Sequence, residues 1–328
     1  MTRALIPMLA VLVAVLFAAS LLIGPAALGL GESLSALFRG EGGAVVLVMQ
    51  EIRLPRAILG LLVGAVLGLS GAAMQGFLRN PLAEPGLIGV SSSAALGAVL
   101  ALQSGVAAAF ALALPLAALA GAGVSVLLIL LLAGPRGGAL SLILAGIAIS
   151  ALTGALTSLV LNLSPNPFAA MEIVYWMMGS LADRSMTHVW LAAPFMLAGM
   201  ALLLLTGRAL DALTLGEDAA RSLGVNLERL RLLLIGGTAL AVGTSVAVAG
   251  AIGFVGLVIP HLLRPLTGGQ PSRLLLASAL GGAAMILASD IAVRLIAPDQ
   301  DLKLGVLTAL VGAPFFLHLL WKLRGVEA

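Results

Sequence analysis

The sequence predicts an all-α polytopic membrane protein with ten transmembrane helices. Of its 328 residues, 61% are hydrophobic and only 9% are charged, whereas a soluble domain has about 25% charged residues. Uncharged runs long enough to cross a bilayer, which takes roughly 20 residues, recur along the chain. A soluble fold could not bury this much apolar surface. We therefore treat residues 1–328 as a single transmembrane domain.

The first uncharged run, residues 4–31, predicts a membrane span. It is too long for the apolar region of a signal peptide, which has about 7–15 residues. The run 85–135 holds two spans separated near Gln103–Gly105, and the run 232–263 is divided by glycines at 250, 253 and 256. The ten predicted spans are residues 4–31, 57–78, two spans within 85–135, 139–161 after a turn at Arg136, 186–206, two spans within 232–263, 274–296 and 304–321. Residues 162–184 are expected to form an interfacial helix and loop.

An even number of spans places both termini on the same side of the membrane. If that side is the cytoplasm, eleven of the 17 Lys and Arg residues lie in cytoplasmic segments and six in external ones. Positive residues are enriched in cytoplasmic loops of membrane proteins. Both termini are therefore predicted to be cytoplasmic.

The longest polar interruption, residues 209–231, lies on the same side in this topology. Gly216 and Gly224 bracket a segment that can form a short helix, and Asn226 can cap a second one. We expect two short helices outside the bilayer, where the chain presents a surface to a soluble partner.

Glycines at 60, 64, 68 and 71 lie on one face of the second span and predict close helix packing. A weak similarity between residues 63–81 and 242–260 suggests an inverted internal repeat, as transporters use.

Three arginines, Arg53, Arg56 and Arg294, are expected at the external side. On pattern alone they are best explained as headgroup anchors, although they could also receive carboxylates from an external protein. Asp290 lies one helical turn before Arg294, and we interpret the two as a structural ion pair.

The composition argues against several other functions. The chain has no cysteine, which excludes disulfides and thiolate metal sites. Its three histidines are isolated, so no metal site is expected, and its basic residues are scattered, so no nucleic acid is expected. There is no G-x-x-x-x-G-K-[ST] phosphate loop and no catalytic motif, so we predict a protein that is not an enzyme and binds no cofactor.

Several stretches resemble the permease subunits of ABC importers. The segment DAARSLG, residues 218–224, resembles their E-A-A-x-x-x-G coupling motif, with Asp218 in place of the usual glutamate. Four further stretches are similar to the branch that takes up ferric siderophores, haem and cobalamin, the FecCD type. They are RLPR (53–56), SGAAMQGFLRNPLAEPGLIGVSS (70–92), GFVGLVIPHLLRPLTG (253–268) and GVLTALVGAPFFLHLL (305–320). The chain departs from that branch at GGQPSR (268–273) and at Leu304, and only local effects are expected there.

This resemblance implies a type II ABC importer permease fold and a homodimer in the bacterial inner membrane. Two copies of a separate ATPase, which carries ATP and magnesium, would dock on the cytoplasmic helices. A periplasmic or extracellular substrate-binding protein would dock on the opposite side. The implied ATPase-coupling residues are Leu215, Gly216, Glu217, Asp218, Ala219, Ala220, Arg221 and Gly224. The implied docking residues for the binding protein are Arg53, Arg56 and Arg294. The candidate pathway-lining residues are Met74, Gln75, Leu78, Ser91, Ser92 and Ser93.

The predicted function is thus the permease subunit of an ATP-driven importer for a metal chelate. Haem, a ferric siderophore and cobalamin all remain open, and iron chelates are the first expectation because they make up most of the family. The alternative is an ion-coupled secondary transporter that works without an ATPase. Such a carrier would need a carboxylate within the membrane, and Asp290 is the available candidate.

Overall fold

The computed structural model describes residues 2–24, 26, 28–40, 43–110, 112–134, 138–297 and 302–324, and within these residues it is helical without a β-strand. The turn expected at Arg136 lies outside the described residues. Ten helices correspond in order to the predicted spans: α1 (Thr2–Leu22), α4 (Leu54–Leu78), α5 (Val90–Gln103), α7 (Ala113–Ala133), α8 (Ala139–Asn162), α10 (Met186–Leu204), α13 (Leu227–Ala249), α14 (Val255–Leu263), α15 (Pro271–Ile296) and α16 (Leu304–Arg324). The elements between them are α2 (Leu30–Phe38), α3 (Ala44–Val46), the π-helix η1 (Leu47–Arg53), the 3₁₀-helix η2 (Pro85–Ile88), α6 (Val106–Ala109), α9 (Pro167–Met177), α11 (Gly207–Leu213), α12 (Glu217–Ser222) and the 3₁₀-helix η3 (Pro265–Thr267).

The lengths of these helices support a polytopic membrane protein. Seven helical segments of the described chain are long and apolar enough to cross a bilayer, and they contain α1, α4, α7, α8, α10, α13 and α15. The other three predicted spans correspond to α5, α14 and α16. Helices α5 and α14 have 14 and 9 residues, and the apolar part of α16 covers Leu304–Leu319. The all-α membrane class is therefore confirmed, while length alone accounts for seven of the ten spans.

Two predicted boundaries are wrong. The first span ends at Leu22 rather than near residue 31, and α2 is a separate helix that begins at Leu30. The second span begins before residue 57, because a continuous helix runs from Ala44 through η1 into α4. The prediction treated the charges of residues 51–56 as a break in the helix. The structure instead keeps Arg53 inside the protein, where it is only 4% exposed.

The predicted division of the run 232–263 is confirmed. Helix α13 ends at Ala249 and α14 begins at Val255. Gly250 has φ +72°, which favours glycine, and its nitrogen still bonds the Val246 carbonyl at 2.8 Å. Phe254 has φ +67°, a conformation that non-glycine residues rarely adopt. This pair of residues turns the chain sharply between the two helices.

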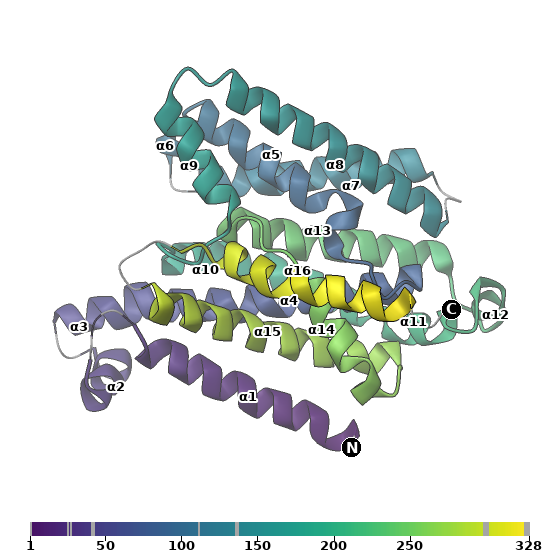
Figure 1. The fold of residues 1–328 in the computed structure, drawn as a ribbon, viewed down its shortest axis with the longest axis horizontal. Coiled ribbons are helices and arrows are strands. Elements are labelled where there is room, and N and C mark those ends of the chain that lie inside the picture. Colours follow the sequence, from purple (N-terminus) through teal and green to yellow (C-terminus); the bar gives the residue numbers. More distant parts are fainter. Residues whose placement is uncertain are drawn as a thin grey trace.

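Most helices run along the long axis of the molecule, with α4 in the middle (Figure 1). Helix α1 lies on one side of α4 and α15, and α5, α7 and α8 lie on the other side of α13. Helix α12 lies at the same end as the start of α1 and the end of α16, and we call this the α12 end. The opposite end carries α2, α3, α6 and α9, and we call it the α2 end. The common side predicted for the termini agrees with this arrangement.

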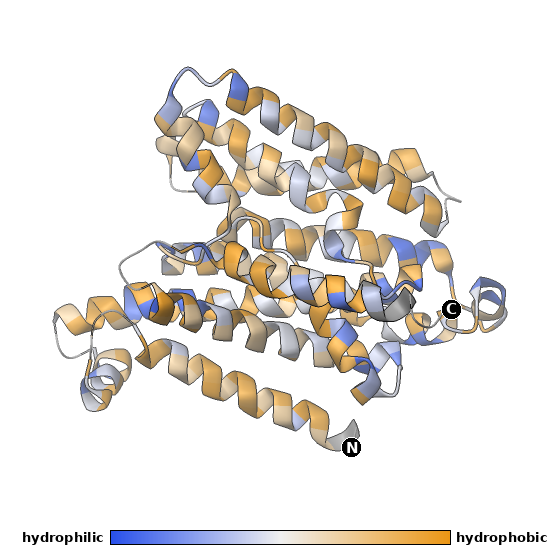
Figure 2. Cartoon of the chain, viewed as in Figure 1, coloured by the Kyte–Doolittle hydropathy of each residue, from blue (hydrophilic) through white to orange (hydrophobic). Residues whose placement is uncertain are grey.

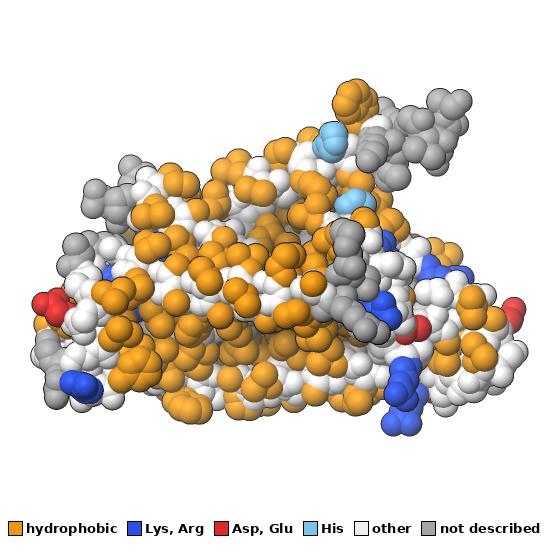
Figure 3. Space-filling view, turned by 90° about the horizontal axis from the view of Figure 1, so that it is seen from below, with side chains coloured by type: hydrophobic (Ala, Val, Ile, Leu, Met, Phe, Trp, Pro, Cys, Tyr) orange, Lys and Arg blue, Asp and Glu red, His pale blue; other side chains and the backbone are white. Residues whose placement is uncertain are grey.

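Hydropathy follows the same axis. Figure 2 shows apolar residues along the length of the helices and hydrophilic residues mainly near the two ends. In the space-filling view of Figure 3, hydrophobic side chains cover the middle of the visible face, and Lys, Arg, Asp and Glu gather toward its ends. An apolar belt between two polar ends is the surface that a bilayer requires of a spanning protein.

The glycines of α4 let its backbone touch two other helices. A Cβ placed on Gly64 would lie 2.3 Å from the Gly282 carbonyl oxygen of α15, and one on Gly68 would lie 2.0 Å from the Ser278 carbonyl oxygen. A Cβ on Gly71 would lie 2.0 Å from the Gly256 oxygen of α14. No side chain fits between these backbones, which confirms the predicted role of this face in packing.

Gly68→Ala is expected to lower the thermal stability of the purified protein markedly, because α4 and α15 would have to separate. Overpacking of this kind costs typically about 1–3 kcal/mol. Gly236→Ala on α13 is the matched control, since its Cβ would meet no atom within 4 Å. Equal unfolding temperatures for the two variants would contradict the packing role of Gly68.

Candidate functional site

Helix α12 is defined by glycines at both of its ends. Gly216, with φ +103°, precedes its first turn, and Gly224, with φ +85°, follows its last. The Gly224 nitrogen bonds the Arg221 carbonyl at 2.9 Å, and the Val225 nitrogen bonds the Ala220 carbonyl at 3.0 Å. These two bonds form a Schellman motif, which satisfies carbonyls at a helix C-terminus. The short helix predicted between Gly216 and Gly224 is therefore confirmed.

Asn226 caps a helix as predicted, since its side chain accepts a hydrogen bond of 2.9 Å from the Arg229 nitrogen. That helix is not short, however. It is the start of α13, which continues for 23 residues to Ala249, because no proline or tight glycine turn interrupts it. The second short helix at this end is α11, which precedes α12.

The predicted coupling residues lie together at the α12 end and differ in exposure. Ala220 is fully buried and anchors α12 against the bundle. Glu217 and Arg221 form an ion pair at 3.9 Å with largely exposed side chains, which is too weak to hold the helix in place. Leu215, just before α12, is 68% exposed, and Leu223, just after it, is 65% exposed. Leu223 was not among the predicted residues. Gly216, Asp218, Ala219 and Gly224 complete the set, and of these only Asp218 and Gly224 are exposed.

Asp211 joins this segment to the transmembrane bundle. One of its carboxylate oxygens accepts a hydrogen bond of 2.8 Å from the Ser272 nitrogen, and the other accepts one of 3.2 Å from the Gln270 amide. Ser272 lies in the first turn of α15, whose free N–H groups need acceptors. A side chain of α11 thus caps α15, the helix that packs most closely on α4. The sequence prediction did not include this role, because the capped helix lies some 60 positions downstream in the chain.

The three predicted docking arginines lie together at the α2 end, and two of them are buried. Arg53 is 4% exposed and donates to the carbonyls of Leu21 and Leu22 at 3.0 and 2.9 Å. Arg294 is 8% exposed and donates to Ser20 and Ile23, as Figure 1 places the C-terminus of α1 beside the end of α15. These carbonyls form the negative end of the α1 dipole.

Asp290 lies at the centre of this group, which we call the arginine cluster (Arg53, Arg56, Asp290 and Arg294). Its carboxylate contacts Arg56 at 2.8 Å and Arg294 at 2.9 Å. The predicted pair with Arg294 is confirmed, and Arg56 is a second partner. All three guanidinium groups are engaged by acceptors within the chain, which was not predicted from the sequence for Arg53 and Arg56. Whether they contribute to docking stays a prediction.

The candidate lining residues lie mostly inside the bundle. Met74, Gln75 and Ser93 are each no more than 5% exposed, while Leu78, Ser91 and Ser92 are half-buried. The Gln75 amide donates to the carbonyls of Gly256 and Leu257, both at 3.3 Å, and its oxygen accepts from Arg264 at 2.7 Å. Gln75 thus ties the end of α4 to α14 in this conformation. A pathway role for these six residues stays a prediction.

An apolar cavity of about 680 Å³ lies instead along α16. Its walls are formed by Met178 at the end of α9, by Phe254 in the α13–α14 turn and by Leu310 and Pro314 of α16. Leu310 and Leu317 are 66% and 65% exposed. In a single chain this groove is therefore a large exposed apolar surface, which helices of another molecule could cover.

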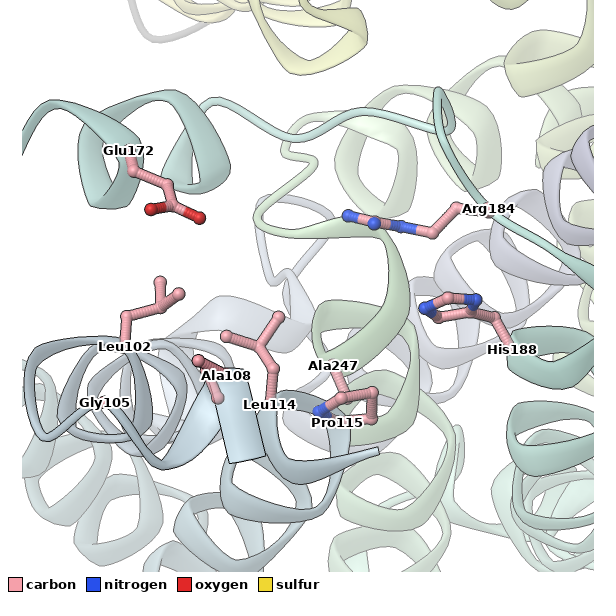
Figure 4. A pocket seen from close by; sticks show the side chains of 10 residues that line it. Leu102, Gly105, Ala108, Leu114, Pro115, Glu172, Arg184, His188 and Ala247 are labelled. Atoms are coloured by element: carbon pink, nitrogen blue, oxygen red, sulfur yellow. The ribbon is translucent and has the colours of Figure 1, made fainter. Parts of the chain in front are cut away.

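A polar cavity of about 310 Å³ lies at the α2 end. Figure 4 shows Glu172 of α9 on one wall and Arg184 and His188 on the opposite wall. The Arg184 Nε donates to the Val248 carbonyl at 2.5 Å. Burial lowers the pKa of Arg184, and the nearby carboxylate of Asp183 partly offsets this. Among the described residues, no three His, Cys, Asp or Glu side chains group as metal ligands would.

Comparison with known proteins gives a consistent result. The model of the FecCD transport family matches residues 12–322. The chain is 39% identical to the uncharacterized ABC transporter permease protein YvrB of Bacillus subtilis, over 92% of this chain and 90% of that protein. It is 41% identical to the vitamin B12 import system permease protein BtuC of Klebsiella pneumoniae, over 90% of this chain and 86% of the relative.

A solved structure is similar over nearly the whole length. It is described as an inward-facing conformation of a metal-chelate type ABC transporter. Its TM-score is 0.86 at 34% sequence identity, and the match covers 98% of this chain and 99% of that one. The predicted permease fold is therefore confirmed.

Asp211→Ala is expected to loosen the start of α15 and lower stability by about 0.5–2 kcal/mol, the usual cost of losing a helix cap. Asp211→Asn should retain most of the stability, because its side-chain oxygen can still accept the Ser272 N–H. Thermal unfolding in detergent measures both variants. Equal destabilisation by alanine and asparagine would show that charge rather than capping matters.

Asp290→Ala is expected to destabilise the protein by about 3–5 kcal/mol, because it leaves the buried guanidinium group of Arg294 and the half-buried one of Arg56 without their carboxylate. Glu172→Gln is the control, since its exposed carboxylate forms no ion pair among the described residues. A stable Asp290→Ala protein would contradict the structural role of the arginine cluster.

Proposed function

This chain belongs to the FecCD transport family, and on that basis we propose that it is the permease subunit of an ATP-driven importer of a metal chelate. The observation that carries this proposal is the α11–α12 segment. It combines the D-A-A-x-x-x-G pattern with two exposed leucines at an end of the molecule that otherwise carries charge. Exposed apolar residues beside charged ones are typical of a protein interface.

A partner ATPase is the occupant that this surface fits. ATP and magnesium would be bound by that partner, and its closure would push on α12. The Asp211 cap would pass the movement from α11 to α15, and the glycine contacts would pass it on to α4. Helices that touch backbone to backbone cannot slide independently, so a small displacement at α12 would be felt in the bundle core.

The orientation follows from the same partner. The ATPase is cytoplasmic, so the α12 end and both termini would face the cytoplasm, in agreement with the excess of Lys and Arg there. The α2 end would face outward and receive a substrate-binding protein. A second copy of this chain would cover the apolar groove on α16 and complete a pathway between the two subunits.

The cargo is proposed at the level of chemistry. The relative from Klebsiella pneumoniae and one from Halobacterium salinarum, 41% identical to this chain, are permease proteins of vitamin B12 or cobalamin import systems. The similar structure is described as a metal-chelate type ABC transporter. We therefore place cobalamin first, and ferric siderophore and haem after it. The earlier preference for iron chelates rested on family size alone.

An ion-coupled carrier fits the structure less well. Asp290 is 2% exposed and bound by two guanidinium groups. A carboxylate that must take up and release an ion cannot remain paired with two fixed cations.

Exchanging the charges of Asp218 and Arg221 is expected to abolish transport while leaving the chain folded. The exchange opposes the dipole of α12 at both ends, which costs about 0.3–1 kcal/mol for each charge, and it inverts the charge pattern offered to the ATPase. Gly224→Asp should act similarly, because φ +85° disfavours a side chain although no atom lies within 4 Å. The measurement is cargo uptake, together with ATPase activity, by the complex reconstituted with its ATPase and binding protein.

Arg273→Gln, which changes an exposed arginine in the first turn of α15 outside α12 itself, is the control and should transport normally. Normal uptake by the exchange variant would remove the coupling role. Uptake by the permease alone under an ion gradient would favour the secondary carrier instead.

A further inference from the structure

A second cavity at the α12 end, of about 500 Å³, lies between the end of α10, α11 and the start of α13. The apolar part of its lining includes Leu205, Ala212 and Leu233. Its remaining wall carries Arg208 and Arg229, together with the turn that contains Gly224. An apolar wall and two cations thus meet in one concave site.

The guanidinium groups of Arg208 and Arg229 have no partner among the described residues. Both residues are exposed, and neither side chain forms an ion pair, hydrogen bond or ring contact there. Arg221 nearby pairs with Glu217, and the arginines of the arginine cluster are fully engaged. Two unpaired cations facing one cavity favour an anion, and guanidinium groups bind phosphate with particular geometric fit.

The cavity opens onto an apolar stripe. Along α10, the exposed residues Trp190, Leu197 and Leu204 recur at spacings of seven, which places them on one helix face. Leu205, which directly follows Leu204 and is 70% exposed, lines the cavity. The stripe runs through the apolar belt, where hydrocarbon covers a spanning protein.

We propose that this cavity binds an anionic phospholipid of the leaflet at the α12 end. Arg208 and Arg229 hold its phosphate, the leucine wall holds its glycerol region, and an acyl chain follows the exposed face of α10. Basic pockets beside transmembrane helices bind such headgroups in other membrane proteins. Since Gly224 lines the same cavity, the bound lipid contacts the coupling turn directly.

An acidic patch on a partner ATPase is the competing occupant. The geometry favours the lipid, because the apolar wall is formed by residues of or next to spanning helices: Leu205 directly follows α10 and Leu233 lies in α13. A soluble partner would reach the arginines and leave that wall uncovered.

The test is native mass spectrometry of the full chain in detergent, with no ATPase present, titrated with phosphatidylglycerol or phosphatidylcholine. We expect one phosphatidylglycerol to bind in preference to phosphatidylcholine. The double variant R208Q/R229Q should weaken phosphatidylglycerol binding by about 30-fold, as expected for the loss of two arginine contacts to an anionic lipid. The charge-matched control R39Q/R273Q alters two exposed arginines outside the cavity and should bind as the unaltered chain does.

A second variant, Ala212→Trp, fills the cavity without changing the charge, and it should also lose binding. Melting curves establish that each variant is folded, and Ala212→Trp carries the test if R208Q/R229Q is not. Equal affinity for the two lipids, equal loss in R39Q/R273Q, or binding retained by Ala212→Trp would overturn the proposal. So would an R208Q/R229Q chain that binds lipid normally but no longer binds the ATPase, since the cavity would then belong to that interface.

Discussion

The backbone contact between α4 and α15 is the constraint on which the rest of the structure depends. Gly64 and Gly68 face the carbonyls of Gly282 and Ser278 with no room for a single methyl group. In lipid, helices gain nothing from the hydrophobic effect by packing on one another, so close van der Waals contact must hold them together. Glycine makes that contact possible, and α4 carries it to α14 as well through Gly71.

Helix α15 is consequently held at three levels. Its first turn is capped by Asp211, its middle lies against the α4 backbone, and its last turns hold Asp290 and Arg294 of the arginine cluster. The two ends of the molecule differ in how they treat charge. At the α2 end Arg53 and Arg294 bond the C-terminal carbonyls of α1, whereas at the α12 end Arg208 and Arg229 have no side-chain partner in the part of the chain that the structure describes. Unsatisfied charge is where partners are expected to bind.

The sequence predicts those features that are local in the chain. Uncharged runs located the ten helices, glycines at 216 and 224 delimited α12, and the glycines after residue 249 located the break between α13 and α14. Features that depend on distant segments were missed. The charge of Arg53 predicts a position at the external side of the membrane before the second span, but hydrogen bonds to the free carbonyls of α1 bury it within the protein. The hydrogen bonds of Asp211 and Gln75 could not be predicted for the same reason, because the groups they bond lie about 60 and 180 positions away in the chain.

The candidate lining residues show what a single chain does and does not specify. Met74 and Gln75 lie on α4 and are buried within the single chain, where Gln75 bonds the carbonyls of Gly256 and Leu257 of α14. The broad apolar surface lies along α16 instead, where Leu310 and Leu317 are exposed. If the pathway runs between two copies of the chain, its walls are residues that a monomer exposes. We therefore expect Leu310 and Pro314, rather than Met74 and Gln75, to lie nearest to the cargo.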